Sequence, residues 1–418
     1  MVKLHKEDHK KMLKKVIYRL LRHRHFWREV GFDELSELYV SGMFRSLSIS
    51  LTGLFVPVYL LQLHFSITQI LVVVAWYFTF RGTFVDLLAG YTVARVGPKH
   101  TMVIGYLILM VSTGLFLTLP QINWPIWLVG GVWGASTSFF YIPFHVDFSK
   151  VKHRKHGGKE LGFMNIMERI GNTLGPLLGG VLATLFGGQF IFLLAAVLLV
   201  VGLIPLFQTA EPIKVNQKLN FRNFNIDHLK RDFISVIALG IENTLSMYLW
   251  PLFLGLYVIT GNGVYVKLGI ITSVSIVVSI SSAQLIGKMI DRYQGRRLLR
   301  VSAGINAAVH LIRPFVSSLP VALGINMANE AVTPGYKMPY VKGWYDAADD
   351  LPGHRIVYIT SMEWVGSITK ATLYWVLALL TLVVSTRVVL NLGFVIAAIA
   401  SIVIMSERFS ALKPKRKY

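Results

Sequence analysis

Ionisable side chains stand inside several long apolar runs of this 418-residue sequence. The carboxylic acids concerned are Glu242, Glu330 and Glu363. A charge buried in hydrocarbon costs about 3 kcal/mol or more, so each of these residues is a candidate for function. Burial disfavours the charged form of a carboxylic acid, which allows such a group to take up a proton near neutral pH. We predict that one of them takes up and releases a proton as part of the protein's function, and we favour Glu330 over Glu242 for this role. The alternative for each is a structural hydrogen bond or ion pair.

Two cationic residues lie in similar apolar surroundings. Arg45 and Lys370 can contact an anionic group of a substrate, or they can neutralise Glu242 and Glu363. An unpaired buried charge is expensive, which favours the second interpretation.

Long apolar helices are needed to hold these residues. The chain is 54% hydrophobic and 15% charged, against about 45–50% and 25% for an ordinary globular protein. Its mean hydropathy is +0.56. A membrane-crossing helix needs about 20 mostly apolar residues, whereas barrel strands are shorter and alternate. We therefore predict an all-α membrane protein with twelve transmembrane helices, over residues 38–61, 68–93, 101–119, 126–148, 161–185, 190–207, 234–258, 268–287, 298–316, 320–343, 358–384 and 389–405.

Several kinds of chemistry lack the residues they require. The sequence has no cysteine, which excludes disulfides, thiolate metal sites and thiol catalysis. It also lacks the phosphate-binding pattern GxxxxGK[ST] and the hydrolase patterns HExxH and GxSxG. We expect no enzyme activity, no cofactor and no metal site.

Lysine and arginine lie mainly on one side of the predicted membrane. Most of the 42 fall in the terminal segments and the loops on that side, and only Lys267 and Arg387 fall in the opposite loops. The positive-inside rule then predicts that both termini are cytoplasmic, in a bacterial inner (plasma) membrane. The net charge of +21 follows from this topology, so we expect no nucleic-acid partner.

The first segment of the chain is basic and amphipathic. Leu13, Val16, Ile17 and Leu20 recur at helical spacing among lysines and arginines. We expect this segment to lie on anionic lipids, and the alternative is a solvated charged tail. The predicted organisation is an N-terminal segment (1–37), a six-helix bundle (38–207), a cytoplasmic linker (208–233), a second six-helix bundle (234–405) and a basic tail (406–418).

Two loops at equivalent places share a sequence pattern. The chain reads GYTVARVGPKH from Gly90, after the second span, and GKMIDRYQGRR from Gly287, after the eighth. Both resemble the G-x-x-x-D-R-x-G-R-R loop of the major facilitator superfamily of secondary transporters. The first copy has Ala94 in place of the aspartate, and the second has one extra residue, Gln294. The resemblance implies that these loops stabilise one conformational state, and a basic loop that only obeys the positive-inside rule is the alternative. The residues concerned are Gly90, Arg95, Gly97, Gly287, Asp291, Arg292, Gly295, Arg296 and Arg297.

The fifth span carries a second motif. Residues 171–180 read GNTLGPLLGG, which resembles the antiporter signature of drug/proton exchangers in the same superfamily. The alternative is a packing face of small residues. The fourth span reads GGVWGA at 130–135 and lacks the arginine that many proton antiporters carry there. The motif residues are Gly171, Gly175, Pro176, Gly179 and Gly180.

The resemblance also implies an architecture and a function. It implies two pseudo-symmetric six-helix halves that rock about a cavity lined by spans 1, 4, 7 and 10. We expect a monomer that exports a small amphipathic or hydrophobic compound in exchange for protons. The alternatives are uptake or facilitated transport of a polar or anionic solute, lysolipid flipping, and a transporter-like receptor without flux.

Particular side chains are expected to face this cavity. The aromatic ones can stack on a substrate or pack within the protein. The cavity candidates are Arg45, Tyr141, Phe144, His145, Asn243, Trp250, Asn329 and Lys370. Four other charged residues are expected nearer the cytoplasmic helix ends, in structural pairs: Asp86, Asp147, Glu168 and Arg169.

Overall fold

A computed structural model gives the fold of the chain. It describes residues 32–52, 56–151, 157–186, 189–207, 219, 226–259, 264–290, 295–351, 353–409 and 412. Most of the predicted amphipathic segment, of the linker and of the basic tail lies outside the described residues, as do Asp291 and Arg292.

The described residues are helical almost throughout and contain no strand, which confirms the prediction of an all-α protein. The first part of the chain forms α3 (Phe32–Thr52), α4 (Val56–Gln62), α5 (Ile67–Phe80), η1 (Arg81–Val85), α6 (Asp86–Val96), α7 (Pro98–Ile122), α8 (Ile126–Val151), α9 (Gly157–Phe186), α10 (Gln189–Leu203) and η2 (Ile204–Phe207). The second part forms α11 (Ile226–Phe253), η3 (Leu254–Val258), α12 (Val264–Met289), α13 (Gly295–Ile312), η5 (Arg313–Phe315), α14 (Leu319–Asp349), α15 (Arg355–Leu380) and α16 (Thr386–Ile404).

Seven helical segments of the described chain are long and apolar enough to cross a membrane by length and composition. The other long helices, such as α9 and α14, contain more charged residues and internal prolines. These two helices also line the interior, where a polar side chain finds protein partners. The total of twelve spans therefore stays a prediction. The seven segments are Leu35–Gln62, Ile67–Val96, Pro98–Ile122, Phe190–Phe207, Asp232–Val258, Val266–Met289 and Thr386–Ile404.

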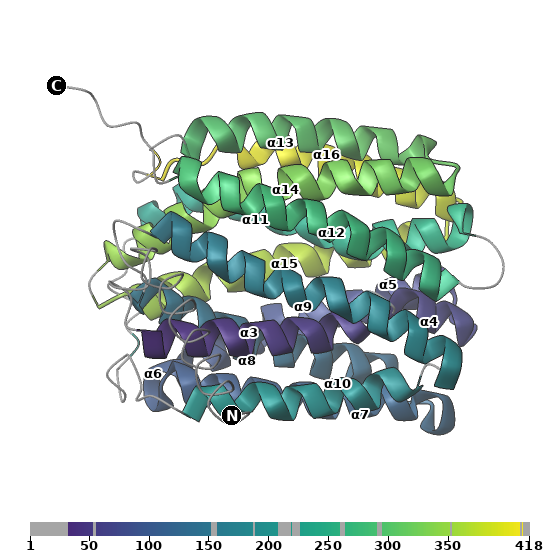
Figure 1. Ribbon diagram of the computed structural model, residues 1–418, viewed down its shortest axis with the longest axis horizontal. Coiled ribbons are helices and arrows are strands. Elements are labelled where there is room, and N and C mark those ends of the chain that lie inside the picture. The colour runs from purple at the N-terminus through teal and green to yellow at the C-terminus, as the bar shows by residue number, and fades with distance from the viewer. Residues whose placement is uncertain are drawn as a thin grey trace, which may run out of the picture.

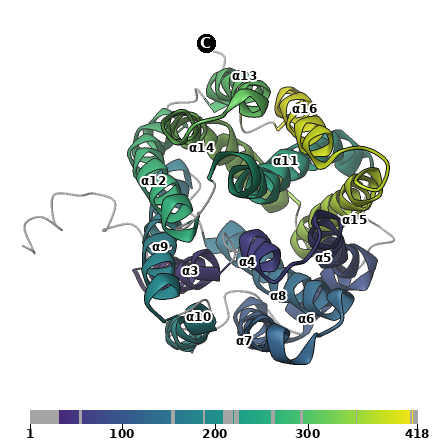
Figure 2. The ribbon, with the colours of Figure 1, turned by 90° about the vertical axis from the view of Figure 1, so that its right-hand side faces the viewer.

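The helices run side by side along the long axis of the molecule (Figure 1). Seen along that axis, α3 to α10 occupy one side and α11 to α16 the other (Figure 2). Two helix pairs make the most extensive contacts between these groups: α9 packs along α12, and α5 packs along α15. The division into two six-helix halves stays a prediction, and this arrangement is the geometry that it requires.

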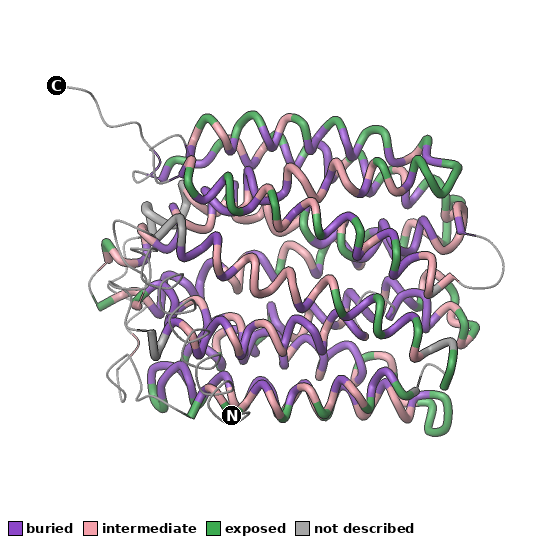
Figure 3. Tube along the Cα trace, in the orientation of Figure 1, coloured by how far each residue is buried: buried purple, intermediate pink, exposed green. Residues whose placement is uncertain are grey.

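Apolar side chains cover the outside of the bundle as well as its core. Exposed residues lie along outward helix faces, and buried residues lie between the helices (Figure 3). The exposed side chains include Phe186, Leu285 and Ile402, each more than half exposed. An apolar belt of this extent would be unfavourable in water, because soluble monomers rarely expose large contiguous apolar patches. The natural solvent for this surface is hydrocarbon.

The small residues of the fifth-span motif lie where α9 touches two neighbours. A Cβ atom on Gly171 would lie 2.5 Å from the carbonyl oxygen of Met43 on α3. On the other side of α9, the carbonyl oxygen of Pro176 lies 2.6 Å from where a Cβ of Gly269 on α12 would stand. Glycine therefore allows α9 to approach α3 and α12 more closely than side chains would permit.

Candidate functional site

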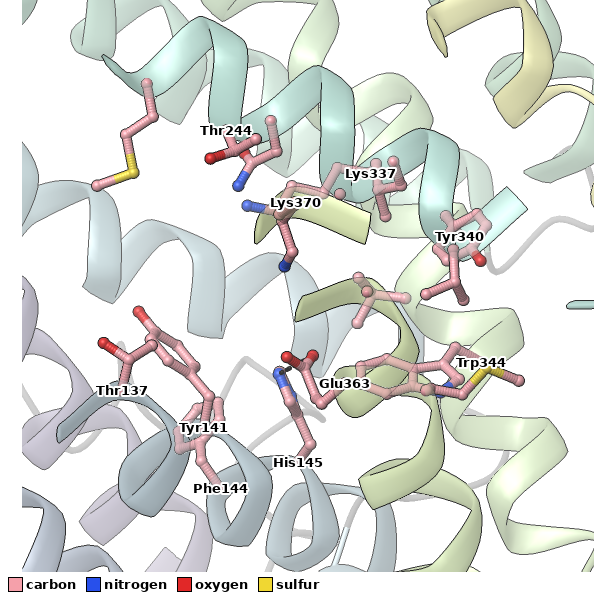
Figure 4. A pocket seen from close by; sticks show the side chains of 18 of the residues that line it. Thr137, Tyr141, Phe144, His145, Thr244, Lys337, Tyr340, Trp344, Glu363 and Lys370 are labelled. Carbon is pink, nitrogen blue, oxygen red and sulfur yellow. Dashed lines mark ion pairs between the residues drawn. The ribbon is translucent and has the colours of Figure 1, made fainter. Parts of the chain in front are cut away.

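A central cavity lies between the two groups of helices. It has two adjoining lobes of about 310 and 320 Å³. Figure 4 shows part of the first lobe, with side chains converging from α8, α11, α14 and α15. Both lobes are bordered by Ile49, Tyr141, Asn165, Glu168, Asn243, Met247 and Lys337.

Seven of the eight predicted cavity residues line this space. Tyr141, Phe144, His145, Asn243 and Lys370 border the first lobe. The second lobe is bordered by Asn243 again, with Tyr141, Trp250 and Asn329. The exception, Arg45, lies behind the cavity wall.

Arg45 is only 1% exposed and sits between α3 and α8. Its guanidinium donates a hydrogen bond to the carbonyl oxygen of Ser136 at 3.3 Å and lies 4.1 Å from the ring centre of Phe140. Its other two nitrogens have no hydrogen-bond partner among the described residues. The possible pairing of Arg45 with Glu242 is therefore not formed, because Glu242 has other partners on helices of the second group.

Glu242 belongs to a buried polar network between α11, α13, α14 and α16. One carboxylate oxygen accepts hydrogen bonds from Asn306 and His310, both at 3.0 Å, and the other accepts from Tyr336 at 2.9 Å. Arg313 donates to Nδ1 of His310 at 3.1 Å. Since Nδ1 accepts this bond, Nε2 must carry the hydrogen that points at Glu242. The network thus links the cation of Arg313 to the carboxylate of Glu242 through a neutral imidazole.

Glu363 is held by Arg81 rather than by Lys370. Arg81 donates to Glu363 at 2.8 Å and to Asp86 at 3.4 Å, and thereby joins α15 to α6. His145 lies 3.9 Å from Glu363, the contact marked by the dashed line in Figure 4, and its other ring nitrogen is 2.6 Å from the hydroxyl of Tyr345. These contacts connect α8, α14 and α15 at one end of the cavity.

Arg81 begins a π-helical turn, η1. Such turns insert one residue into a helix and recur at functional sites. Trp364 on α15 donates to the carbonyl oxygen of Gly82 at 2.6 Å, within this turn. The irregular turn therefore places a charged side chain, Arg81, and a hydrogen-bond-accepting carbonyl, that of Gly82, against α15.

Glu330 forms an ion pair with Arg169, which joins α14 to α9. Both side chains border the second lobe and are partly accessible from it. Arg169 and its neighbour Glu168 were expected nearer the cytoplasmic helix ends, in structural pairs. Both border the central cavity, and Arg169 is the one that forms a pair.

The structure describes the whole of the first motif loop, whereas residues 291–294 of the second lie outside the described residues. Gly97 has φ of 94°, a conformation that favours glycine, and it caps α6 before α7 begins. Arg95 stacks on Tyr91, with 5.3 Å to the ring centre. In the second loop, Arg296 donates to Glu407 at 2.7 Å and to the carbonyl oxygen of Phe409 at 3.0 Å. Arg296 thus ties α13 to the segment after α16.

Some site residues were missed from the sequence. Asn306, His310 and Arg313 follow at intervals of four and three, which places them on one face of a helix. A polar stripe of this kind on an apolar helix was the signal that could have revealed the Glu242 network. Lys337 offered a weaker signal, because α14 is polar on many sides.

The fold and the charged interior cavity define a polytopic helical membrane transporter. The chain belongs to the Major Facilitator Superfamily, whose sequence profile matches residues 38–334. The recognition made from the motif loops is thereby confirmed. Members of this superfamily are transporters rather than enzymes.

Individual relatives share the family at low identity. The chain is 28% identical over 235 residues to a protein of Citrobacter koseri named multidrug resistance protein MdtG, covering 52% of this chain and 56% of that one. It is 26% identical over 243 residues to a Lactococcus lactis homolog of the multi-drug resistance efflux pump PmrA, covering 55% and 58%. The matched region thus spans a little over half of each relative.

The arrangement of the helices has close counterparts among solved structures. The crystal structure of the transporter FucP in its outward conformation superposes with a TM-score of 0.64 at 13% identity, covering 89% of this chain and 96% of FucP. The superposition shows a common fold, and at this low identity it shows the fold alone.

Proposed function

We propose that this protein is a secondary active transporter that exports a small amphipathic compound in exchange for protons, by alternating access. The matched relatives carry names of drug-efflux proteins, and the cavity combines aromatic walls with ionisable groups. In this proposal the protein works as a monomer in a bacterial plasma membrane, with both termini in the cytoplasm and its basic N-terminal segment on anionic lipids.

The ion pair between Arg169 and Glu330 is the observation that carries the proposal. It joins a helix of the first group to a helix of the second, at the wall of the cavity. Protonation of Glu330 removes its charge and so removes the attraction that holds α9 to α14 at this point. A proton can therefore change the contact between the two groups of helices, which is what coupled alternating access requires.

The other two acids are less suited to this role. Glu242 accepts three hydrogen bonds within the second group of helices alone. A proton there would disrupt local structure without loosening a contact between the groups. Glu363 also bridges the groups, but two basic side chains, Arg81 and His145, lie beside it. We therefore propose Glu330 as the main coupling site.

The test uses purified protein in proteoliposomes with a pH-sensitive dye in the lumen. Addition of a transported solute should change the luminal pH in wild-type vesicles and leave empty vesicles unchanged. A thermal-shift screen across compound classes identifies the solute, because a ligand that binds only the folded state raises its apparent stability. Solute flux without any proton movement would contradict the proposed coupling, and ligand binding without flux would favour a receptor.

A further inference from the structure

The charged residues that line the cavity are unequal in number. Among the described lining residues, the two lobes have one more cation than carboxylate. The cations are Arg81, Arg169, Arg313, Lys337 and Lys370, and the carboxylates are Glu168, Glu242, Glu330 and Glu363.

The cavity-lining cations that are not tied to an acid are the two lysines. Each of the three arginines is tied to an acid, Arg81 to Glu363 and Arg169 to Glu330 directly, and Arg313 to Glu242 through its histidine. Neither Lys337 nor Lys370 takes part in any of the ion pairs found in the described chain.

Glu168 also faces both lobes and forms no ion pair with described residues. Lys337 and Lys370 therefore both face the cavity without a direct ion-pair partner among the described residues.

Lys370 has room for a ligand around its ammonium group. Two glycines stand beside it: Cβ atoms on Gly240 and Gly366 would each lie 3.7 Å from Nζ. The ammonium also lies 5.0 Å from the ring centre of Phe78. Figure 4 shows the Lys337 and Lys370 side chains reaching into the same pocket from α14 and α15.

The wall of the first lobe is aromatic. Its lining includes Tyr77, Phe78, Trp133, Tyr141, Tyr248 and Trp344. Flat apolar rings suit a hydrophobic or aromatic body, and two ammonium groups suit an anionic head. An organic cation would meet the same two lysines in this lobe, and they disfavour its binding.

We propose that the substrate is an amphipathic organic anion, with its charged head at Lys370 and Lys337 and its apolar body on the aromatic wall. This inference names the substrate class for the proposed transport function and rests on it. Export of an anion also agrees with the electrical gradient. An interior-negative potential of about 100 mV alone favours the outward distribution of a monovalent anion by about 50-fold.

The experiment compares two probes that share a ring system and carry permanent opposite charges, naphthalenesulfonate and naphthyltrimethylammonium. Binding to the full-length wild-type protein in detergent is measured by calorimetry. Naphthalenesulfonate should bind at least tenfold more tightly than the cation. Lys370→Gln should weaken its binding about tenfold, and Lys370→Arg should keep most of it.

Two further variants separate a charge effect from damage to the fold. Glu168→Gln should tighten binding of the anion, because it removes a repelling carboxylate. Lys288→Gln changes an exposed lysine outside the cavity and should leave both affinities unchanged. Unfolded variants would be identified by thermal unfolding and would not produce opposite effects on the two probes. Lysophosphatidate carries an anionic head group on a lipid chain. Competition between it and naphthalenesulfonate would indicate that the natural anion comes from the membrane, and a lack of competition would indicate an anion from water.

Tighter binding of the cation, or unchanged anion binding in Lys370→Gln, would overturn the inference. Flux separates this failure from failure of the proposed function. If proteoliposomes transport the cation and exclude the anion, the transporter proposal stands and the substrate class is wrong. If the anion binds as expected but neither probe is transported, the substrate class stands and the transport proposal is wrong.

Discussion

Arg169 of α9 forms an ion pair with Glu330 of α14, and both residues border the same lobe of the central cavity. The pair joins the first group of helices to the second. Removing one partner of a partly buried ion pair is costly, because the other charge then lies uncompensated in a medium of low dielectric constant. A change of protonation at this point therefore acts on the contact between the two groups of helices.

We predict that Glu330→Gln abolishes the solute-driven change in luminal pH. Glutamine keeps the size of the side chain but cannot exchange a proton. Solute binding should remain within a few-fold of wild type in calorimetry, because the lysines that we assign to the anion are unchanged. Asp350→Asn is the matched control, an exposed acid at the end of α14. An intact pH response in Glu330→Gln would remove this residue from the coupling mechanism.

Replacement of Glu242 should affect stability. Glu242→Gln leaves Arg313 and His310 without their acid in the buried network. Leaving the buried charge of Arg313 without its counter-charge typically costs about 3–5 kcal/mol, so we expect a clear fall in the midpoint of thermal unfolding. Tryptophan fluorescence in detergent measures this midpoint. Full stability together with a lost pH response would instead make Glu242 the coupling acid.

Two glycines of α7 give a matched test of helix packing. A Cβ on Gly105 would lie 2.7 Å from the carbonyl carbon of Phe139 on α8, whereas a Cβ on Gly114 meets nothing within 4 Å. Gly105→Ala should destabilise the protein by about 1–3 kcal/mol through overpacking. Gly114→Ala should be neutral or slightly stabilising, since alanine favours the helix. Equal midpoints of thermal unfolding for the two variants would show that α7 and α8 do not pack as described.

The segment after α16 should loosen when Glu407 loses its charge. Arg296 holds this segment through Glu407 and Phe409, and Leu412 is buried near Gly295. The chain has no cysteine, so a single cysteine in place of Leu412 reports exposure. Loss of a hydrogen bond between charged groups costs about 1.5–3 kcal/mol, so Glu407→Gln should speed maleimide labelling about tenfold. Arg408→Gln, a neighbouring exposed change, should leave the rate unaltered.

Much of the fold could be predicted from the sequence because hydrocarbon imposes simple requirements. Each span needs a long apolar run, and the helices cover the predicted ranges apart from the non-helical residues 316, 381–384 and 405 and from 53–55, which lie outside the described residues. Glu160 of α9 was left outside the predicted span, which begins at 161, because hydropathy assigns charged residues to water. Protein partners, rather than solvent, accommodate them.

Partners of charged residues were harder to predict than their positions. Sequence reasoning identified Glu242, Glu330 and Glu363, and one of its two interpretations made Arg45 and Lys370 the counter-charges of Glu242 and Glu363. The structure pairs them with His310, Arg169 and Arg81 instead. A pairing depends on the rotation of each helix about its axis, and apolar composition defines that rotation poorly when both faces are hydrophobic.

Uphill movement of solute is the most direct test of the whole account. Proteoliposomes are given a pH gradient with the lumen acidic, and the uptake of labelled naphthalenesulfonate is followed with the membrane potential clamped at zero. The account predicts accumulation above the external concentration in wild-type vesicles, collapse of that gradient by a protonophore, and no accumulation with Glu330→Gln. If the wild-type protein only brings the solute to equal concentrations on both sides, whatever the pH gradient, proton-coupled transport would be contradicted.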